Sequence, residues 1–83
     1  GNFHVALLID KNNKDELEKL ENFLVRISER AIRMDGTCTG EHGVGQGKRK
    51  YMLKELGNAV EIMKQVKNAI DPDKIMNPGK LFL

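Results

Sequence analysis

The chain has 83 residues and a mass of 9.4 kDa, so it holds one domain at most and is too short for most complete enzymes. A composition of 40% hydrophobic and 31% charged residues excludes a disordered chain, and a net charge of only +2 argues against a dedicated nucleic-acid binder. The single cysteine, Cys38, excludes an internal disulfide and is typical of a reducing, intracellular compartment.

The chain opens on Gly1 rather than Met, and we expect it to be a piece of a longer protein. Residues 3–10, FHVALLID, form a short apolar run whose length and content of Val and Ile predict a buried strand. A strand buried on both faces needs neighbouring strands for its backbone hydrogen bonds, and the sequence offers no second one. We therefore expect the neighbour to come from a partner chain or from another part of the protein.

A long amphipathic helix is predicted from about Lys14 to about Met34, ending at Gly36. Asn13, followed three residues later by Glu16, is typical of a capping box. Acidic residues crowd the first turns and basic residues the last, as the helix dipole favours. Apolar residues recur at spacings of three and four and form one stripe: Leu17, Leu20, Leu24, Ile27, Ala31 and Met34.

Residues 36–47, GTCTGEHGVGQG, contain five of the eight glycines and show no periodic pattern. We name this segment the glycine loop, because backbone without side chains can turn tightly and approach a ligand closely. Glycine spacing and the preceding helix do not match a dinucleotide-binding fingerprint.

Two more helices and a tail follow the glycine loop. The first covers roughly residues 48–56 and ends at Gly57, and the second is capped by Asn58. The predicted buried face of that last helix consists of Ala59, Met63, Val66 and Ile70. Residues 71–83, the tail, read as a short turn and a Pro-Gly bend. The predicted fold class is therefore α+β: one N-terminal strand, a long amphipathic helix, the glycine loop, two further helices and a short tail.

Three residues are candidates for a metal site or for proton transfer, namely His4, Glu41 and His42. Imidazole and carboxylate both bind divalent metals, and imidazole titrates near neutral pH. Their spacing matches no standard metal motif. A lone histidine such as His4 is more often a core or edge residue than a ligand.

Basic residues gather in the second half of the chain. Residues 43–83 carry eight Lys and Arg against four Asp and Glu, whereas residues 1–42 carry six against eight. The cluster Lys48-Arg49-Lys50 begins a predicted helix, where positive charge opposes the helix dipole. This cluster is either a surface for phosphate or nucleic acid, or a solvated or interdomain face.

Three segments together resemble a known family: GNFH at 1–4, GTCTGEHGVGQGKR at 36–49 and DPDKIMNPGK at 71–80. In this order they are similar to the C-terminal end of FAD-linked oxidases of the vanillyl-alcohol-oxidase type. The most similar branch is that of D-lactate dehydrogenase (cytochrome) and the glycolate oxidase D-subunit. The resemblance implies that residues 1–83 are the C-terminal part of the cap domain, with the FAD-binding domain outside them. We expect this piece alone to be inactive.

The resemblance also implies an activity and roles for four residues. The parent enzyme would oxidise a D-2-hydroxy acid, D-lactate or glycolate, to the 2-oxo acid by hydride transfer to flavin. His42 would be the catalytic base, His4 and Glu41 would hold a divalent metal, Zn or Mn, and Asn77 would lie close to the FAD. An upstream histidine would complete the metal ligands.

The expected partners of the parent enzyme are a small 2-hydroxy acid and an electron-acceptor protein or quinone, with no nucleic acid. This piece, whose strand and helix stripe lack their neighbours, is expected to self-associate. The alternative function is a non-catalytic module that binds phosphate or nucleic acid, or that drives oligomerisation.

Overall fold

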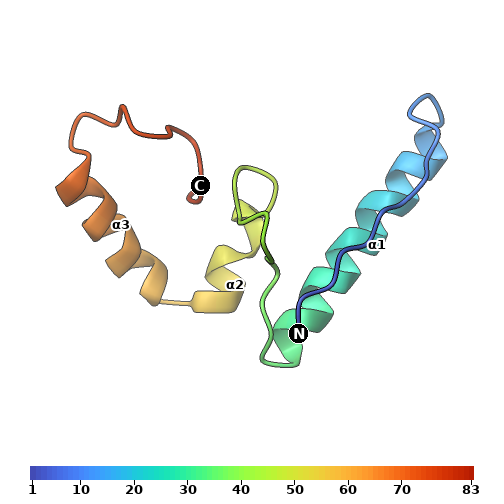
Figure 1. Cartoon of the computed structure of the whole chain (residues 1–83), viewed down its shortest axis with the longest axis horizontal. Coiled ribbons are helices and arrows are strands. Elements are labelled where there is room, and N and C mark those ends of the chain that lie inside the picture. Colours follow the sequence, from blue (N-terminus) through green and yellow to red (C-terminus); the bar gives the residue numbers. More distant parts are fainter. The chain divides into compact units, whose positions relative to one another are not determined.

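A computed structural model describes all residues, 1–83, and contains four helical elements (Figure 1). They are α1 (Lys14–Arg33), the 3-10 helix η1 (Arg49–Tyr51), α2 (Met52–Leu56) and α3 (Ala59–Ile70). The chain divides into two compact units, unit 1 (Gly1–Glu41) and unit 2 (His42–Leu83). None of the helices combines the length and the hydropathy that crossing a membrane requires.

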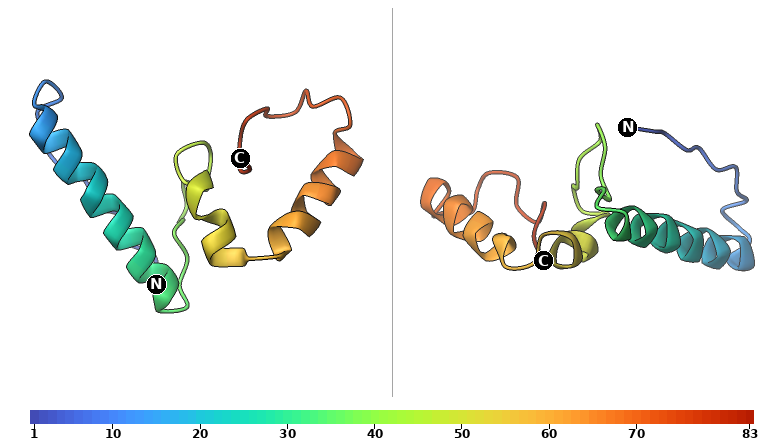
Figure 2. Two further views of the ribbon diagram at one scale, coloured as in Figure 1. Left: turned by 180° about the vertical axis from the view of Figure 1, so that it is seen from behind. Right: turned by 90° about the horizontal axis from the view of Figure 1, so that it is seen from below.

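The predicted N-terminal strand is wrong. Residues 1–10 have no regular secondary structure. They run antiparallel to α1 and arch away from it, as Figure 2 shows. Val5 and Leu8 of this run are 51% and 102% exposed. Because a strand needs a paired neighbour and no other segment of the chain is extended into one, the apolar run stays unpaired. The regular elements are thus all helices, and the α+β description does not hold.

The start of α1 follows the predicted capping pattern with one change. The side-chain Oδ1 of Asn13 accepts the backbone N–H groups of Asp15 and Glu16 at 3.1 and 3.2 Å. Glu16 reaches back as in a capping box, but its carboxylate accepts the N–H of Asp10 at 2.7 Å. The N–H of Asn13 donates instead to the carbonyl of Asp10 at 3.0 Å. The turn before the helix is thereby tied to its first turn.

The end of α1 is a Schellman motif that explains the glycine at position 36. The N–H of Gly36 donates to the carbonyl of Ala31 at 2.8 Å, and the N–H of Asp35 to that of Ile32 at 3.1 Å. Asp35 takes the left-handed conformation, with φ of 59°. A Cβ at Gly36 would lie 2.9 Å from the Ala31 carbonyl oxygen. Glycine is therefore needed here for space rather than for its freedom in φ.

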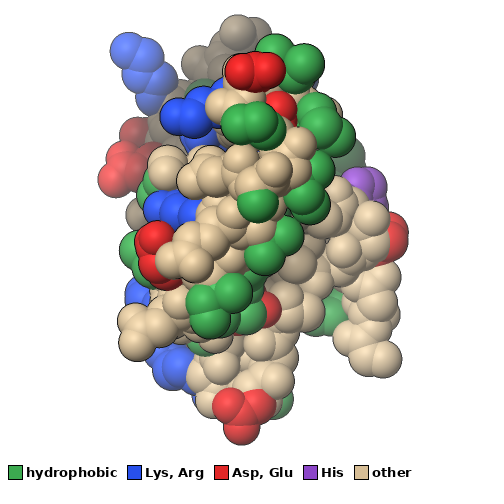
Figure 3. Space-filling view, turned by 90° about the vertical axis from the view of Figure 1, so that its left-hand side faces the viewer, with side chains coloured by type: hydrophobic (Ala, Val, Ile, Leu, Met, Phe, Trp, Pro, Cys, Tyr) green, Lys and Arg blue, Asp and Glu red, His purple; other side chains and the backbone are tan.

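Most of the apolar stripe of α1 is not covered by the rest of the chain. Ser28 is the buried residue of this helix, while Leu17, Leu24 and Met34 are 39%, 43% and 65% exposed. On unit 2, apolar side chains that reach the surface are visible in Figure 3, which is seen from the side of α3. The expected self-association stays a prediction, and this exposed apolar surface supports it.

The interior of unit 2 is small and is built where η1, α2 and α3 follow one another. Tyr51, Met52 and Val60 are its buried apolar residues, each at most 6% exposed. The predicted buried face of α3 is wrong, since Val66 and Ile70 are 54% and 68% exposed.

Asn58 precedes α3 but does not cap it through its side chain. Its backbone is already helical, with φ of −64° and ψ of −16°, rather than in the extended conformation that a capping side chain uses. The boundaries of α3 nevertheless agree with the prediction, and Gly57 ends α2 as expected.

Candidate functional site

The carboxylate of Glu41 lies between two side chains from the N-terminal segment of unit 1. Asn2 donates from Nδ2 to one carboxylate oxygen, Oε2. The Nδ1 of His4 lies 3.5 Å from the other, Oε1, and the two side chains of this pair are 61% and 53% exposed. Unit 1 therefore brings together the two predicted metal ligands, which are far apart in the sequence.

Gly40 makes room for this arrangement. A Cβ at Gly40 would overlap Oδ1 of Asn2, so a larger residue would push Asn2 away from Glu41. Asn2 was not among the residues singled out in the sequence. A signal was available, because residues two apart in an extended segment point to the same side, and Asn2 stands two positions before His4.

His42 is bonded to Glu41 through the backbone and begins unit 2, with an exposed side chain. Beyond His42, Gly43 and Gly45 have φ of 72° and 51°, and no atom lies within 4 Å of where their Cβ atoms would be. Their freedom in φ, rather than close packing, accounts for these two glycines.

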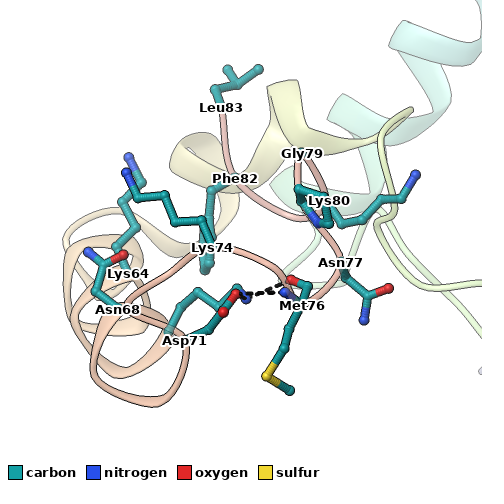
Figure 4. Close-up of a pocket in the computed structure, with 12 residues that line it drawn as sticks. Lys64, Asn68, Asp71, Lys74, Met76, Asn77, Gly79, Lys80, Phe82 and Leu83 are labelled. Carbon is teal, nitrogen blue, oxygen red and sulfur yellow. Dashed lines mark hydrogen bonds and ion pairs between the residues drawn. The ribbon is translucent and has the colours of Figure 1, made fainter.

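The start of the tail is organised by the carboxylate of Asp71, which Figure 4 draws. This carboxylate is 2% exposed and accepts three hydrogen bonds. The donors are Nζ of Lys67 and the backbone N–H groups of Ile75 and Met76, the latter two at 3.0 Å. Lys67 also donates to the carbonyl of Met76 at 2.7 Å. The hydrogen bond from Lys67 lowers the pKa of Asp71 below its ordinary value, burial opposes this, and the backbone N–H groups lower it further.

This cluster predicts that the start of the tail loosens in acid. Because the folded pKa of Asp71 lies below the unfolded value of about 3.9, the carboxylate stabilises the fold above that value. The stabilisation is lost as the pH falls through the folded pKa. Amide exchange at Ile75 and Met76 should therefore accelerate below about pH 4, beyond its intrinsic pH dependence.

In Asp71→Asn, the amides of Ile75 and Met76 should exchange fast already at neutral pH, and the additional acceleration in acid should be absent. Asp73→Asn, at an exposed position in the same turn, is the control. It should leave the exchange rate and its acid dependence unchanged. Equal protection of the two amides in Asp71→Asn and in the unaltered protein would contradict the assignment.

Asn77, the residue predicted to lie near FAD, occupies the bend that follows this cluster. It is exposed, has φ of 46° and precedes Pro78. In Figure 4 its side chain points away from Asp71. It borders a cavity of about 380 Å³ between α3 and the tail, with Lys64, Lys74 and Lys80 among the lining residues.

The basic cluster at residues 48–50 is not a row of three equivalent surface cations. Arg49 donates from Nε to the carbonyl of Gln46 at 3.2 Å and from Nη1 to that of Gly79 at 2.9 Å. The ammonium of Lys50 lies 5.3 Å from the ring centre of Tyr51, a cation–π distance. The guanidinium is thus used within unit 2, which argues against the interpretation as a phosphate or nucleic-acid surface.

Residues 1–81 match the family of FAD linked oxidases, C-terminal domain. The chain belongs to this family. The predicted resemblance is thereby confirmed, and with it the parent family of oxidoreductases.

Relatives of this FAD-linked oxidase domain align along nearly its whole length. It is 49% identical over 83 residues to the probable mitochondrial D-lactate dehydrogenase of Danio rerio, covering 99% of this chain and 17% of the relative. It is 52% identical over 86 residues to the mitochondrial D-lactate dehydrogenase [cytochrome] of Arabidopsis thaliana, covering 99% and 15%. Identity to glycolate oxidase subunit GlcD of Bacillus subtilis is 46% over 83 residues, covering 99% and 18%. The chain thus spans less than a fifth of the length of these relatives.

Proposed function

We propose that the protein containing this domain oxidises a D-2-hydroxy acid, D-lactate or glycolate, to the 2-oxo acid, with FAD as hydride acceptor. Residues 1–83 would supply the catalytic base and two metal ligands. The single observation that carries the proposal is the pairing of His4 with Glu41, the residue directly before His42 in the chain. The relatives named as D-lactate dehydrogenases and as a glycolate oxidase subunit support the substrate class.

The geometry of the pair suits a divalent metal such as Zn²⁺ or Mn²⁺. Two ligand atoms bound to Zn²⁺ at 2.0–2.1 Å in tetrahedral geometry lie about 3.3 Å apart. The 3.5 Å between Nδ1 of His4 and Oε1 of Glu41 is close to this separation. The hydrogen bond from Asn2 to the second carboxylate oxygen is of the kind that orients a metal ligand.

The chemistry divides between the bound groups and the residues of this domain. When bound, FAD accepts the hydride from the hydroxyl-bearing carbon, and a divalent metal lowers the pKa of the hydroxyl. His42 accepts the hydroxyl proton as general base, so the substrate loses a hydride and a proton and becomes the 2-oxo acid. The exposed carboxamide of Asn77 can both donate and accept hydrogen bonds, which fits the polar edge of a flavin ring.

The test is the flavin spectrum of the full parent protein. The purified protein should be yellow, and anaerobic addition of D-lactate or glycolate should bleach the flavin band. L-lactate serves as the control and should leave the band unchanged. A colourless protein, or a flavin that neither D-lactate nor glycolate reduces, would contradict the proposal.

A further inference from the structure

We infer that Arg49 is a positioning residue that holds the tail against the end of the glycine loop. Its guanidinium donates to three backbone carbonyls: Gln46 at 3.2 Å, Gly79 at 2.9 Å and Phe82 at 3.5 Å. The first belongs to the glycine loop and the other two to the tail. A backbone hydrogen bond of 2.8 Å, from the N–H of Leu81 to the carbonyl of Gly45, joins the same two segments.

The shape of the guanidinium explains why one side chain can join two segments. It is planar and presents N–H groups in fixed directions, so Nε can serve one segment while Nη1 serves the other. Lysine would bring the same charge as a single point on a flexible stem. All three acceptors are neutral carbonyls of unit 2, and Arg49 is half-buried.

This contact fixes the far end of a short segment whose near end Asp71 already holds. Asp71 accepts the N–H groups of Ile75 and Met76, and Arg49 reaches the carbonyl of Gly79. Asn77 stands between the two anchors with a left-handed backbone, a conformation that Asn adopts more readily than most residues with a side chain. Arg49 therefore helps to set the position of the Asn77 carboxamide relative to the part of the glycine loop that follows His42. The effect on turnover rests on the proposed function, whereas the effect on the tail does not.

The test compares Arg49→Gln, Arg49→Lys and the control Lys50→Gln in the full parent protein. Amide exchange of Leu81, read by mass spectrometry of peptides covering the tail, should become at least about tenfold faster in both Arg49 variants. Lys50→Gln removes the neighbouring charge and should leave the exchange unchanged. If the Leu81 amide in Arg49→Gln or in Arg49→Lys exchanges as slowly as in the unaltered protein, the role of the guanidinium is overturned. Should Arg49→Gln fail to accumulate, Arg49→Lys, which keeps the charge, decides the question alone.

A second readout separates this inference from the proposed function. Exchange at Leu81 needs neither substrate nor turnover, so it reports on the tail even if D-lactate and glycolate leave the flavin oxidised. Where the parent protein does turn over, kcat should fall in Arg49→Gln while the metal content, which depends on unit 1, stays unchanged. Faster exchange with unaltered kcat would overturn the link between the tail and the reaction.

Discussion

Replacing His42 with alanine is expected to lower kcat of the full parent protein by about 10²–10⁴-fold at neutral pH, with the flavin still bound. In the proposed mechanism the imidazole takes the proton from the substrate hydroxyl, and His42 is the only residue of the glycine loop with a basic side chain. Turnover with D-lactate and glycolate, normalised to flavin absorbance, measures the loss. Because His42 is exposed, its removal should cost little stability.

Glu61→Gln is the matched control for this experiment. It changes an exposed ionisable residue on α3, remote from the glycine loop in the sequence, and should leave kcat unaltered. Turnover retained within a factor of a few in His42→Ala would assign the proton to another group. The role of the glycine loop would then be limited to binding.

If Glu41 holds a divalent metal as proposed, replacing it with glutamine is expected to remove that metal and to lower kcat/KM by more than about 100-fold. Glutamine has nearly the same size, and its amide oxygen can still accept the hydrogen bond from Asn2. The negative charge that pairs with a divalent cation is lost, and a neutral amide is a far weaker ligand. The metal content of the dialysed parent protein, measured by elemental mass spectrometry, reports the loss directly.

Glu18→Gln serves as the control here, because Glu18 is an exposed carboxylate of α1 in the same unit. It should keep both the metal and the activity. A Glu41→Gln protein that retains its metal and its full kcat/KM would show that the carboxylate is not a ligand. The contact with His4 would then be an ordinary surface pairing.

Local signals in the sequence predicted the helices well. The capping residue Asn13 and the glycines at 36 and 57 each act through backbone atoms a few residues away. Such signals hold wherever the rest of the protein lies, so the bounds of α1 and α3 came out as predicted.

Burial was harder to predict, because it depends on surfaces outside the chain. Residues 3–10 have the composition of a strand, yet residues 1–83 supply no neighbouring strand to accept their backbone hydrogen bonds. On α3 the apolar pattern predicted Val66 and Ile70 as core residues, whereas Val60 is the buried one. Apolar pattern shows which side chains favour burial, and only a neighbouring surface decides which are covered.

Residue type singled out His4, Glu41 and His42, and the resemblance supplied their roles, whereas spacing contributed nothing. Nothing in the interval between His4 and Glu41 predicts that they meet, because the contact depends on the path of residues 1–10 beside α1. Arg49 was assigned to a basic surface because sequence shows charge but not which backbone carbonyls lie within reach. Asn2 escaped notice since an amide carries neither charge nor a titrating group.

The glycines after His42 impose a requirement of handedness rather than of size. Gly43 and Gly45 have positive φ with open space around them, whereas Gly40 and Gly36 have neighbours that a Cβ would strike. A mirror-image residue such as D-alanine favours the very backbone angles that L-residues avoid at positions 43 and 45. The bend that follows the proposed base would thus accept D-alanine in a chemically synthesised chain. D-Alanine would also restrict the conformations open to residues 43 and 45 in the unfolded chain. No gene-encoded amino acid could do so there without strain in the folded state.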